Sequence, residues 1–183
     1  CRTFPRDKDD LILFSPSIID KLQELIYNEY KIIIFTNQSR LLKKPEIADL
    51  FEGKHEFIKN IFSNNNYSML AALELDHCRK PNTGLFDFLL EKTKLTIDYS
   101  NSFFVGDAAG RVKTSNFKKD FSCADRMFAE NIGLTFYTPE EFFLNESPRK
   151  FIMEQESIKL FPESNANINF KKLMKYNILM LVA

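Results

Sequence analysis

The chain has 183 residues, of which 44% are hydrophobic, and it contains 19 phenylalanines. This is sufficient for one domain with a full core. Its 25 basic and 25 acidic side chains balance, which excludes an overall field that attracts polyanions, so any polyanion site must be a local basic cluster.

The longest apolar runs are far too short to cross a bilayer, so we expect no membrane association. Three cysteines without a C-x-x-C pair predict a reduced, intracellular protein. We find no secretory signal, although the chain opens on Cys1 rather than on methionine, which leaves targeting open.

Helices and strands alternate along most of the chain. Helices are indicated by apolar residues that recur every three to four positions, and buried strands by continuous apolar runs. The predicted helices cover 15–30, 45–62, 83–95, 122–132 and a turn from 138, and the predicted strands cover 31–35, 67–75, 102–105 and 134–137. This order predicts an α/β fold with a doubly wound, mainly parallel, Rossmann-like sheet.

The pattern divides the chain into three parts. Residues 1–145 carry the alternating elements and form the predicted domain. Residues 146–175 are of mixed polarity with proline, serine and asparagine, and predict a linker. Residues 176–183 are apolar again and predict one more strand.

Four polar residues stand at the predicted ends of these elements. Asp107 follows a buried strand, Asp125 lies at a helix start, Thr36 ends the strand KIIIF, and Lys80 precedes a helix. Parallel strands bring such residues to one edge of the sheet. Two carboxylates there suit a hard cation such as Mg²⁺, and a lysine can neutralise charge on a transferred phosphoryl group. The alternatives remain open: strand-end turns, an acid favoured by the helix dipole, and a solvated lysine.

Two basic clusters flank the same predicted edge. Their members are Arg40, Lys43 and Lys44 after Thr36, and Arg111, Lys113, Lys118 and Lys119 after Asp107. Basic runs are usually solvated faces. Because both clusters lie at the same predicted edge, they nevertheless favour a surface that binds the phosphate backbone of a nucleic acid.

At these residues the chain resembles the phosphatase domain of the polynucleotide kinase 3′-phosphatase family, within the haloacid dehalogenase-like superfamily. The matching segments span about residues 4–144: FPRDKDD, KIIIFTNQ, RKPNTGLFD, FFVGDAAGR, DFSCADRMFAENIG and TPEEFFL. GDAAGR followed by DFSCADR is far more specific than the loose superfamily motifs. The haloacid dehalogenase-like superfamily has four motifs. In this resemblance, Thr36 falls on the second superfamily motif, Lys80 on the third, and Asp107 and Asp125 on the fourth.

The resemblance implies a Mg²⁺-dependent phosphatase that removes 3′-phosphates from DNA ends through an aspartyl-phosphate. It implies that Thr36 binds the phosphoryl oxygens, that Lys80 stabilises the phosphate charge, and that the metal is held by Asp107 and, directly or through water, by Asp125. Substrate contacts are expected from Asn37, Gln38, Arg40, Lys43, Lys44, Arg79 and Arg111. We further expect a nuclear monomer that acts in DNA strand-break repair, in contact with repair proteins.

The family pattern differs from this chain in two places. The first motif, D-x-D-G-T, supplies the nucleophile and the general acid, and it is expected upstream of FPRDKDD together with the first strand of the sheet. Asp7, Asp9 and Asp10 do not follow a buried strand and cannot replace it. We therefore interpret the chain as part of a longer active protein, with an inactive homologue as the alternative. Residues 39–44 also stand where the family often has glycines.

The last residues of the sequence, 176–183, resemble the start of a second domain. In bifunctional members, a strand like residues 176–183 leads into the P-loop of a 5′-kinase domain. The alternative is a terminal element of the same domain.

Two other functions also remain open: hydrolysis of a small phosphomonoester, as in the similar histidinol-phosphate phosphatases, and a non-catalytic module that binds broken ends.

Overall fold

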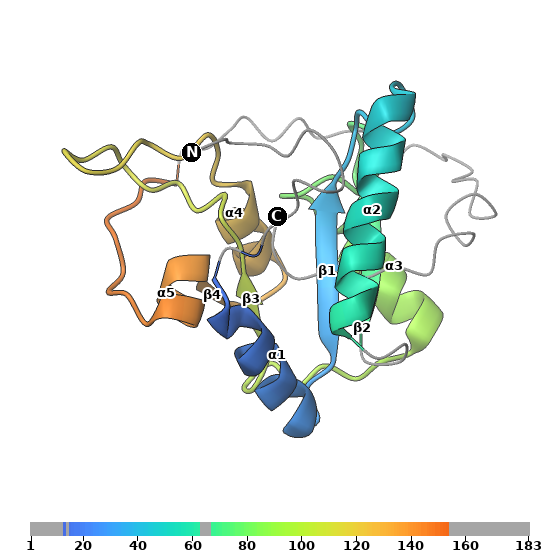
Figure 1. Cartoon of the computed structure of the whole chain (residues 1–183), viewed down its shortest axis with the longest axis horizontal. Coiled ribbons are helices and arrows are strands. Elements are labelled where there is room, and N and C mark those ends of the chain that lie inside the picture. The colour runs from blue at the N-terminus through green and yellow to red at the C-terminus, as the bar shows by residue number, and fades with distance from the viewer. Residues whose placement is uncertain (1–12, 14, 63–66, 154–183) are drawn as a thin grey trace.

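The computed structural model describes residues 13, 15–62 and 67–153 of the chain. Helices and strands alternate along these residues, as Figure 1 shows. The elements are α1 (Ser17–Tyr27), β1 (Ile32–Asn37), α2 (Pro45–Ile61), β2 (Tyr67–Ala72), α3 (Gly84–Thr93), β3 (Phe103–Val105), α4 (Ala124–Asn131), β4 (Thr135–Tyr137) and α5 (Pro139–Leu144). None of the helices in this part of the chain is long and apolar enough to cross a membrane.

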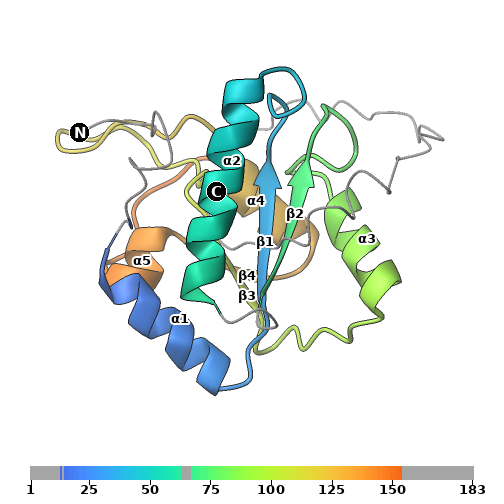
Figure 2. The ribbon, with the colours of Figure 1, turned by 45° about the vertical axis from the view of Figure 1, so that its right-hand side comes forward.

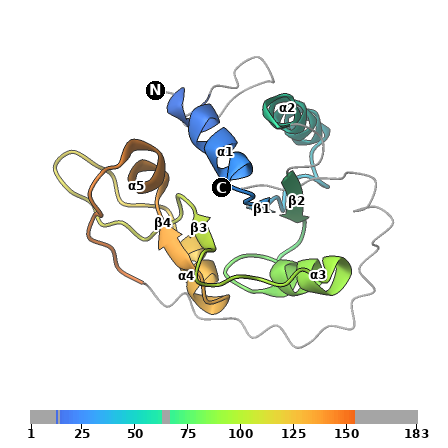
Figure 3. The same cartoon turned by 90° about the horizontal axis from the view of Figure 1, so that it is seen from below.

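The strands pair in parallel. β1 runs beside β2, with Ile32 opposite Tyr67, and β3 runs beside β4, with Phe103 opposite Thr135. Within the described residues these are two separate two-stranded sheets. In Figure 3, α1 and α2 lie on one side of the strands, and α3 and α4 lie on the other. Parallel strands covered by helices on both sides confirm the predicted α/β class.

Aromatic side chains connect the two strand pairs. The Phe128 ring of α4 lies 5.3 Å from the Phe35 ring of β1 and 5.3 Å from the Phe104 ring of β3, measured between centroids. On the other side, Ile32 and Val105 belong to one buried cluster. These contacts hold β1 and β3 in one body, so the residues at their carboxyl ends have fixed relative positions.

Several predicted elements are shorter than expected; the helix predicted over 15–30, for example, is α1 at Ser17–Tyr27. The strand predicted to reach residue 75 ends at Ala72, and Leu75 is 62% exposed, so the apolar residues beyond Ala72 are not part of the core. The helix predicted to reach residue 95 ends at Thr93, because Lys94 adopts a left-handed backbone conformation with φ of 52°.

The final described residues return to the domain. The Ile152 N–H donates to the Gly110 carbonyl over 2.9 Å, and the Val112 N–H donates to the Lys150 carbonyl over 3.1 Å. The predicted linker thus begins with residues that lie along the segment after β3. The FPRDKDD segment, the rest of the predicted linker and the apolar stretch 176–183 lie outside the described residues, and the three-part division stays a prediction.

Candidate active site

A buried ion pair joins Lys80, from the loop after β2, to Asp125, from the first turn of α4. Lys80 Nζ lies 2.6 Å from Asp125 Oδ1, and the two side chains are 3% and 1% exposed. Lys80 Nζ also lies 5.6 Å from the centroid of the Phe104 ring. The fold therefore brings together two predicted site residues that are 45 positions apart in the sequence. Charges this deeply buried are stable only because they are paired.

The end of β1 is bonded to the same loop. Asn37 Nδ2 donates to the Lys80 carbonyl over 3.2 Å, and the Lys80 N–H donates to Asn37 Oδ1 over 3.0 Å. Beside it, Gln38 Nε2 donates to the hydroxyl of Thr36, which is buried, over 2.9 Å. Thr36 and Lys80 are thus connected through Asn37. The loops after β1 and β2 leave the strands at the same end, as Figure 2 shows.

Asp107 directly follows the end of β3 and Gly106. Its Oδ1 atom is buried and has no hydrogen-bond partner among the described residues. Burial, with the charge of Asp125 as the next largest cause, raises the pKa of Asp107 to about 6, while Lys80 and Arg111 act in the opposite direction. The charges of Asp125, Lys80 and Arg111 therefore all act on Asp107.

The unpaired oxygen of Asp107 is suited to a cation. A buried carboxylate oxygen without a donor is rare in proteins, and Mg²⁺ prefers oxygen ligands of this kind. Asp125 differs, because its Oδ1 contacts Lys80 and its Oδ2 accepts the Ala108 N–H over 3.0 Å. This geometry favours Asp107 as a direct ligand and Asp125 as its support. The assignment of metal ligands stays a prediction.

Gly106 is required by the close approach of Asp125. A Cβ atom at Gly106 would lie 2.6 Å from Asp125 Cβ and 2.7 Å from Asp125 Oδ2. Any larger residue there would push the carboxylate away from Lys80 or from the loop after β3. The glycine in the Gly-Asp motif therefore provides space, and its partner is visible only in the tertiary structure.

The predicted basic substrate residues differ in their exposure. Arg40, Lys43 and Lys44 are exposed after β1, and Arg79 is half-buried beside Lys80. In the second basic cluster, which follows Asp107, the exposed members are Lys113, Lys118 and Lys119.

Arg111 differs from the other members of the two basic clusters, which are all exposed. It is buried, and its guanidinium contacts Asp120 and Glu140. Neither acid is among the predicted site residues, although Asp120 begins the DFSCADR segment and Glu140 lies in TPEEFFL, because nothing in the sequence pairs these segments with Arg111.

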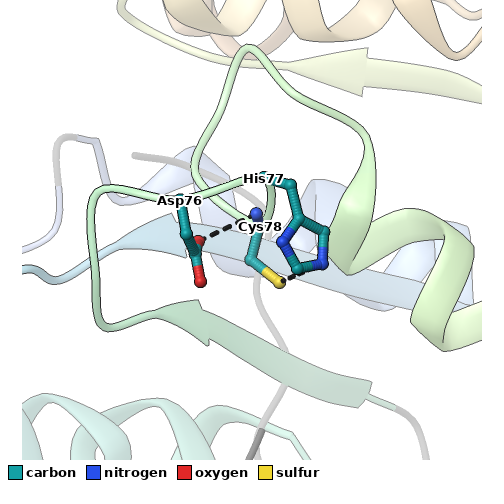
Figure 4. Close-up of side chains that lie close together, drawn as sticks. All are labelled: Asp76, His77 and Cys78. Atoms are coloured by element: carbon teal, nitrogen blue, oxygen red, sulfur yellow. Dashed lines mark hydrogen bonds between the residues drawn. The ribbon is translucent and has the colours of Figure 1, made fainter. Parts of the chain in front are cut away.

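A second cluster of donor atoms lies in the loop that leads to Lys80. The atoms of Asp76, His77 and Cys78 that could bind a metal lie within 4.8 Å of one another. Figure 4 shows the three side chains close together. Burial raises the pKa of the Cys78 thiol to about 11, so the thiol is protonated at neutral pH. Asp76 Oδ1 accepts the Cys78 N–H over 2.9 Å, which is a turn-forming contact. We interpret this cluster as the turn that shapes the Lys80 loop.

Comparison with known proteins identifies the family. The model of the family described as "Polynucleotide kinase 3 phosphatase" matches residues 1–143. The chain belongs to the polynucleotide kinase 3′-phosphatase family. It is similar to the "Bifunctional polynucleotide phosphatase/kinase" of Schizosaccharomyces pombe, with 36% identity over 186 residues that cover 99% of this chain and 43% of that protein.

Two further proteins with polynucleotide-directed names are also similar to the chain. The "Putative bifunctional polynucleotide phosphatase/kinase" of Acanthamoeba polyphaga mimivirus is 35% identical over 92% of this chain and 48% of its own length. The "Polynucleotide 3'-phosphatase ZDP" of Arabidopsis thaliana is 35% identical over 74% of this chain and 21% of its own length. Histidine biosynthesis bifunctional proteins match less strongly. The chain spans less than half the length of these polynucleotide-directed relatives. The matches confirm the predicted family and the prediction of a phosphatase domain.

Proposed function

We propose that the protein containing this chain is a Mg²⁺-dependent polynucleotide 3′-phosphatase that acts on DNA ends in strand-break repair. One observation carries the proposal. The buried Lys80–Asp125 pair is bonded through Asp125 Oδ2 to the loop of Asp107, whose buried Oδ1 has no donor among the described residues. A cation and an ammonium group at one edge would counter the charge of a phosphoryl group during its transfer.

The roles proposed for the site residues come from the family resemblance and agree with their contacts. The Thr36 hydroxyl, next to the loop of Lys80, would bind a phosphoryl oxygen. Lys80 would offset negative charge on the phosphate, and Asp125 holds Lys80 in place through the 2.6 Å ion pair. Asp107 would hold Mg²⁺, which when bound acts as a Lewis acid on the phosphate. By family resemblance, an aspartate upstream of these residues is the nucleophile.

The polynucleotide part of the proposal is supported by local charge. The net charge of the chain is zero, so attraction to DNA must come from clusters. Arg40 and Lys43 are exposed just after β1, and Lys113 and Lys118 are exposed after β3. Neutralisation of phosphates by such side chains makes binding weaken as the salt concentration rises. The family resemblance adds an attached 5′-kinase, a nuclear location and a monomeric state to the proposal.

The test uses the full-length protein that contains this chain and an oligonucleotide with a 3′-phosphate. We expect phosphate release that requires Mg²⁺, stops with chelator, and falls in Asp107→Asn by at least about 10-fold, which is what loss of an outer-shell partner costs. Asp98→Asn, in an exposed turn, is the matched control and should retain activity. Release that is unaffected by chelator or by Asp107→Asn would overturn the mechanism.

The same assay separates the remaining alternatives. A small phosphomonoester, added in competition, should be hydrolysed far less efficiently than the oligonucleotide. Preference for the small ester would overturn the polynucleotide assignment. Tight binding of the oligonucleotide without phosphate release would instead support a non-catalytic module.

A further inference from the structure

A short loop that begins at Asp107 and ends at Arg111 follows β3, and acids from elsewhere in the chain bind its backbone N–H groups. The Ala108 N–H donates to Asp125 Oδ2 over 3.0 Å, and the Arg111 N–H donates to Asp120 Oδ2 over 2.9 Å. Satisfied backbone groups give a loop little freedom to move. The carboxyl group of Asp107 is therefore presented from a rigid support.

The carbonyl groups of this loop are also bonded. The Ala108 carbonyl accepts the backbone N–H of Arg126 over 3.3 Å, and the Ala109 carbonyl accepts Arg126 Nε over 2.9 Å. The Gly110 carbonyl accepts the Ile152 N–H over 2.9 Å. The contacts come from α4 and from the last described residues, so several elements hold the loop at once.

Arg111 holds the loop from its far end and reaches back to its start. Its Nε donates to both carboxylate oxygens of Asp120, over 3.0 and 2.8 Å, and its Nη1 donates to Glu140 Oε2 over 2.7 Å. Its Nη2 donates to the backbone carbonyl of Asp107 over 3.1 Å. The side chain is 9% exposed. All three nitrogen atoms of the guanidinium are thus bound within the protein.

The charges around Arg111 balance locally. The two acids that face it are Asp120 and Glu140, and the second oxygen of Glu140 accepts from Arg149 Nη2 over 3.1 Å. Arg126 also interacts with Arg111, and its charge is in turn offset by Glu141. Three acids (Asp120, Glu140, Glu141) and three bases (Arg111, Arg126, Arg149) thus leave no net positive charge to attract a phosphate. Arg40, in contrast, is exposed. The geometry and the charge both argue against Arg111 as a substrate contact.

We propose that Arg111, fixed by Asp120 and Glu140, is a positioning residue that holds Asp107 in the geometry needed to bind the cation. This proposal rests on the proposed function, which places Mg²⁺ at Asp107. Partners that orient a metal ligand typically contribute about 10–100-fold to metal affinity or activity. A lysine in this place would keep the charge but lose the planar fork that spans Asp120, Glu140 and the Asp107 carbonyl.

The test compares the full-length protein with its Arg111→Lys variant in three measurements. Hydrogen exchange without metal should be at least about 10-fold faster for the amides of Ala109 and Arg111, which bond to Asp120. Calorimetric titration with MgCl₂ alone should show a dissociation constant raised by about 10–100-fold. High Mg²⁺ should restore kcat, and KM for a 3′-phosphorylated oligonucleotide at saturating Mg²⁺ should change by less than about two-fold.

Two further variants keep the test decisive. Arg40→Lys is the matched control, because it makes the same substitution at an exposed arginine, and it should leave hydrogen exchange and Mg²⁺ affinity unchanged. Glu140→Gln keeps the fold and a neutral hydrogen bond while weakening the hold on Arg111, and it should reproduce the loss of Mg²⁺ affinity. It serves as the main variant if Arg111→Lys fails to fold.

The outcomes separate this proposal from the proposed function. The positioning role is overturned if both variants keep the Mg²⁺ affinity and exchange rates of the unsubstituted protein, or if Arg111→Lys raises KM at saturating Mg²⁺. Failure of the unsubstituted protein to release 3′-phosphate would overturn the proposed function alone, because the exchange and titration measurements use no nucleic acid.

Discussion

Lys80 Nζ and Asp125 Oδ1 lie 2.6 Å apart in a part of the fold that is almost closed to solvent. The pair joins the loop after β2 to the start of α4, and the second oxygen of Asp125 binds the loop of Asp107. One carboxylate thus connects the lysine to the residue predicted to hold the cation. A change at either partner should affect both the fold and the chemistry.

Loss of the ammonium group should destabilise the protein strongly. Lys80→Met leaves Asp125 buried and without its cation, and removal of one partner from a buried pair typically costs about 3–5 kcal/mol. Urea denaturation should show this decrease in the free energy of unfolding. Lys92→Met is the matched control, because Lys92 forms an exposed pair with Glu91 and should cost less than about 1 kcal/mol. Equal effects of the two substitutions would contradict a stabilising role for the buried pair.

Gly106→Ala should damage the site through crowding. The new Cβ would lie 2.6 Å from Asp125 Cβ, and overpacking of this kind costs about 1–3 kcal/mol. We expect a lower melting temperature together with reduced phosphatase activity. Gly53→Ala is a control within α2, where alanine should stabilise the helix by up to about 1 kcal/mol. If Gly106→Ala melts at the original temperature, the contact with Asp125 is not tight.

Asn37 should determine the position of Lys80. Asn37→Ala removes both hydrogen bonds to the Lys80 backbone, which together contribute about 1–3 kcal/mol. A misplaced Lys80 should also lower kcat, while Mg²⁺ affinity should stay near its original value because Asp107 is untouched. Steady-state kinetics and calorimetry can measure the two effects. A change confined to Mg²⁺ affinity would refute this role for Asn37.

The raised pKa of Asp107 predicts how stability depends on pH. In the unfolded chain this carboxyl has a pKa near 3.8, and in the folded protein burial raises it to about 6. Its contribution to stability is therefore full below the unfolded pKa and is lost as the pH rises through about 6. Without divalent cations at pH 7.5, Asp107→Asn should stabilise the fold by about 1–2 kcal/mol, a value reduced to allow for partial exposure. Thermal melts between pH 4 and 8, in chelator, test this; equal melting curves at pH 7.5 would contradict it.

The same carboxyl should make Mg²⁺ binding depend on pH. Protons compete with the cation for Asp107, so the apparent affinity for Mg²⁺ should fall as the pH drops below about 6. Calorimetric titrations with MgCl₂ at pH 5 and pH 7.5 can measure the difference. Asp98→Asn should show the same dependence as the unsubstituted protein, because Asp98 is in an exposed turn. An affinity that is constant between the two pH values would mean that Asp107 is not a ligand.

Local patterns predicted the elements of the fold well. The continuous apolar run of β1 predicts a strand covered on both faces, and the structure has helices on both sides of it. The end of β2 was harder to predict, because apolar residues continue past Ala72 and only the tertiary structure shows that Leu75 is outside the core. Local apolar character predicts burial, but it does not show where a strand loses its partner.

The sequence by itself determined the alternation of helices and strands, the family motifs, and the identity of Thr36, Lys80, Asp107 and Asp125 as candidates. Only the tertiary structure decided what surrounds each of them. Arg111 illustrates the difference, because a basic residue close to Asp107 predicts a phosphate contact, whereas the fold places Asp120 and Glu140 around it. Hydrogen bonds and ion pairs between distant segments leave no periodic signal in a sequence, so the surroundings that decide the role of a charged side chain arise only when the chain folds.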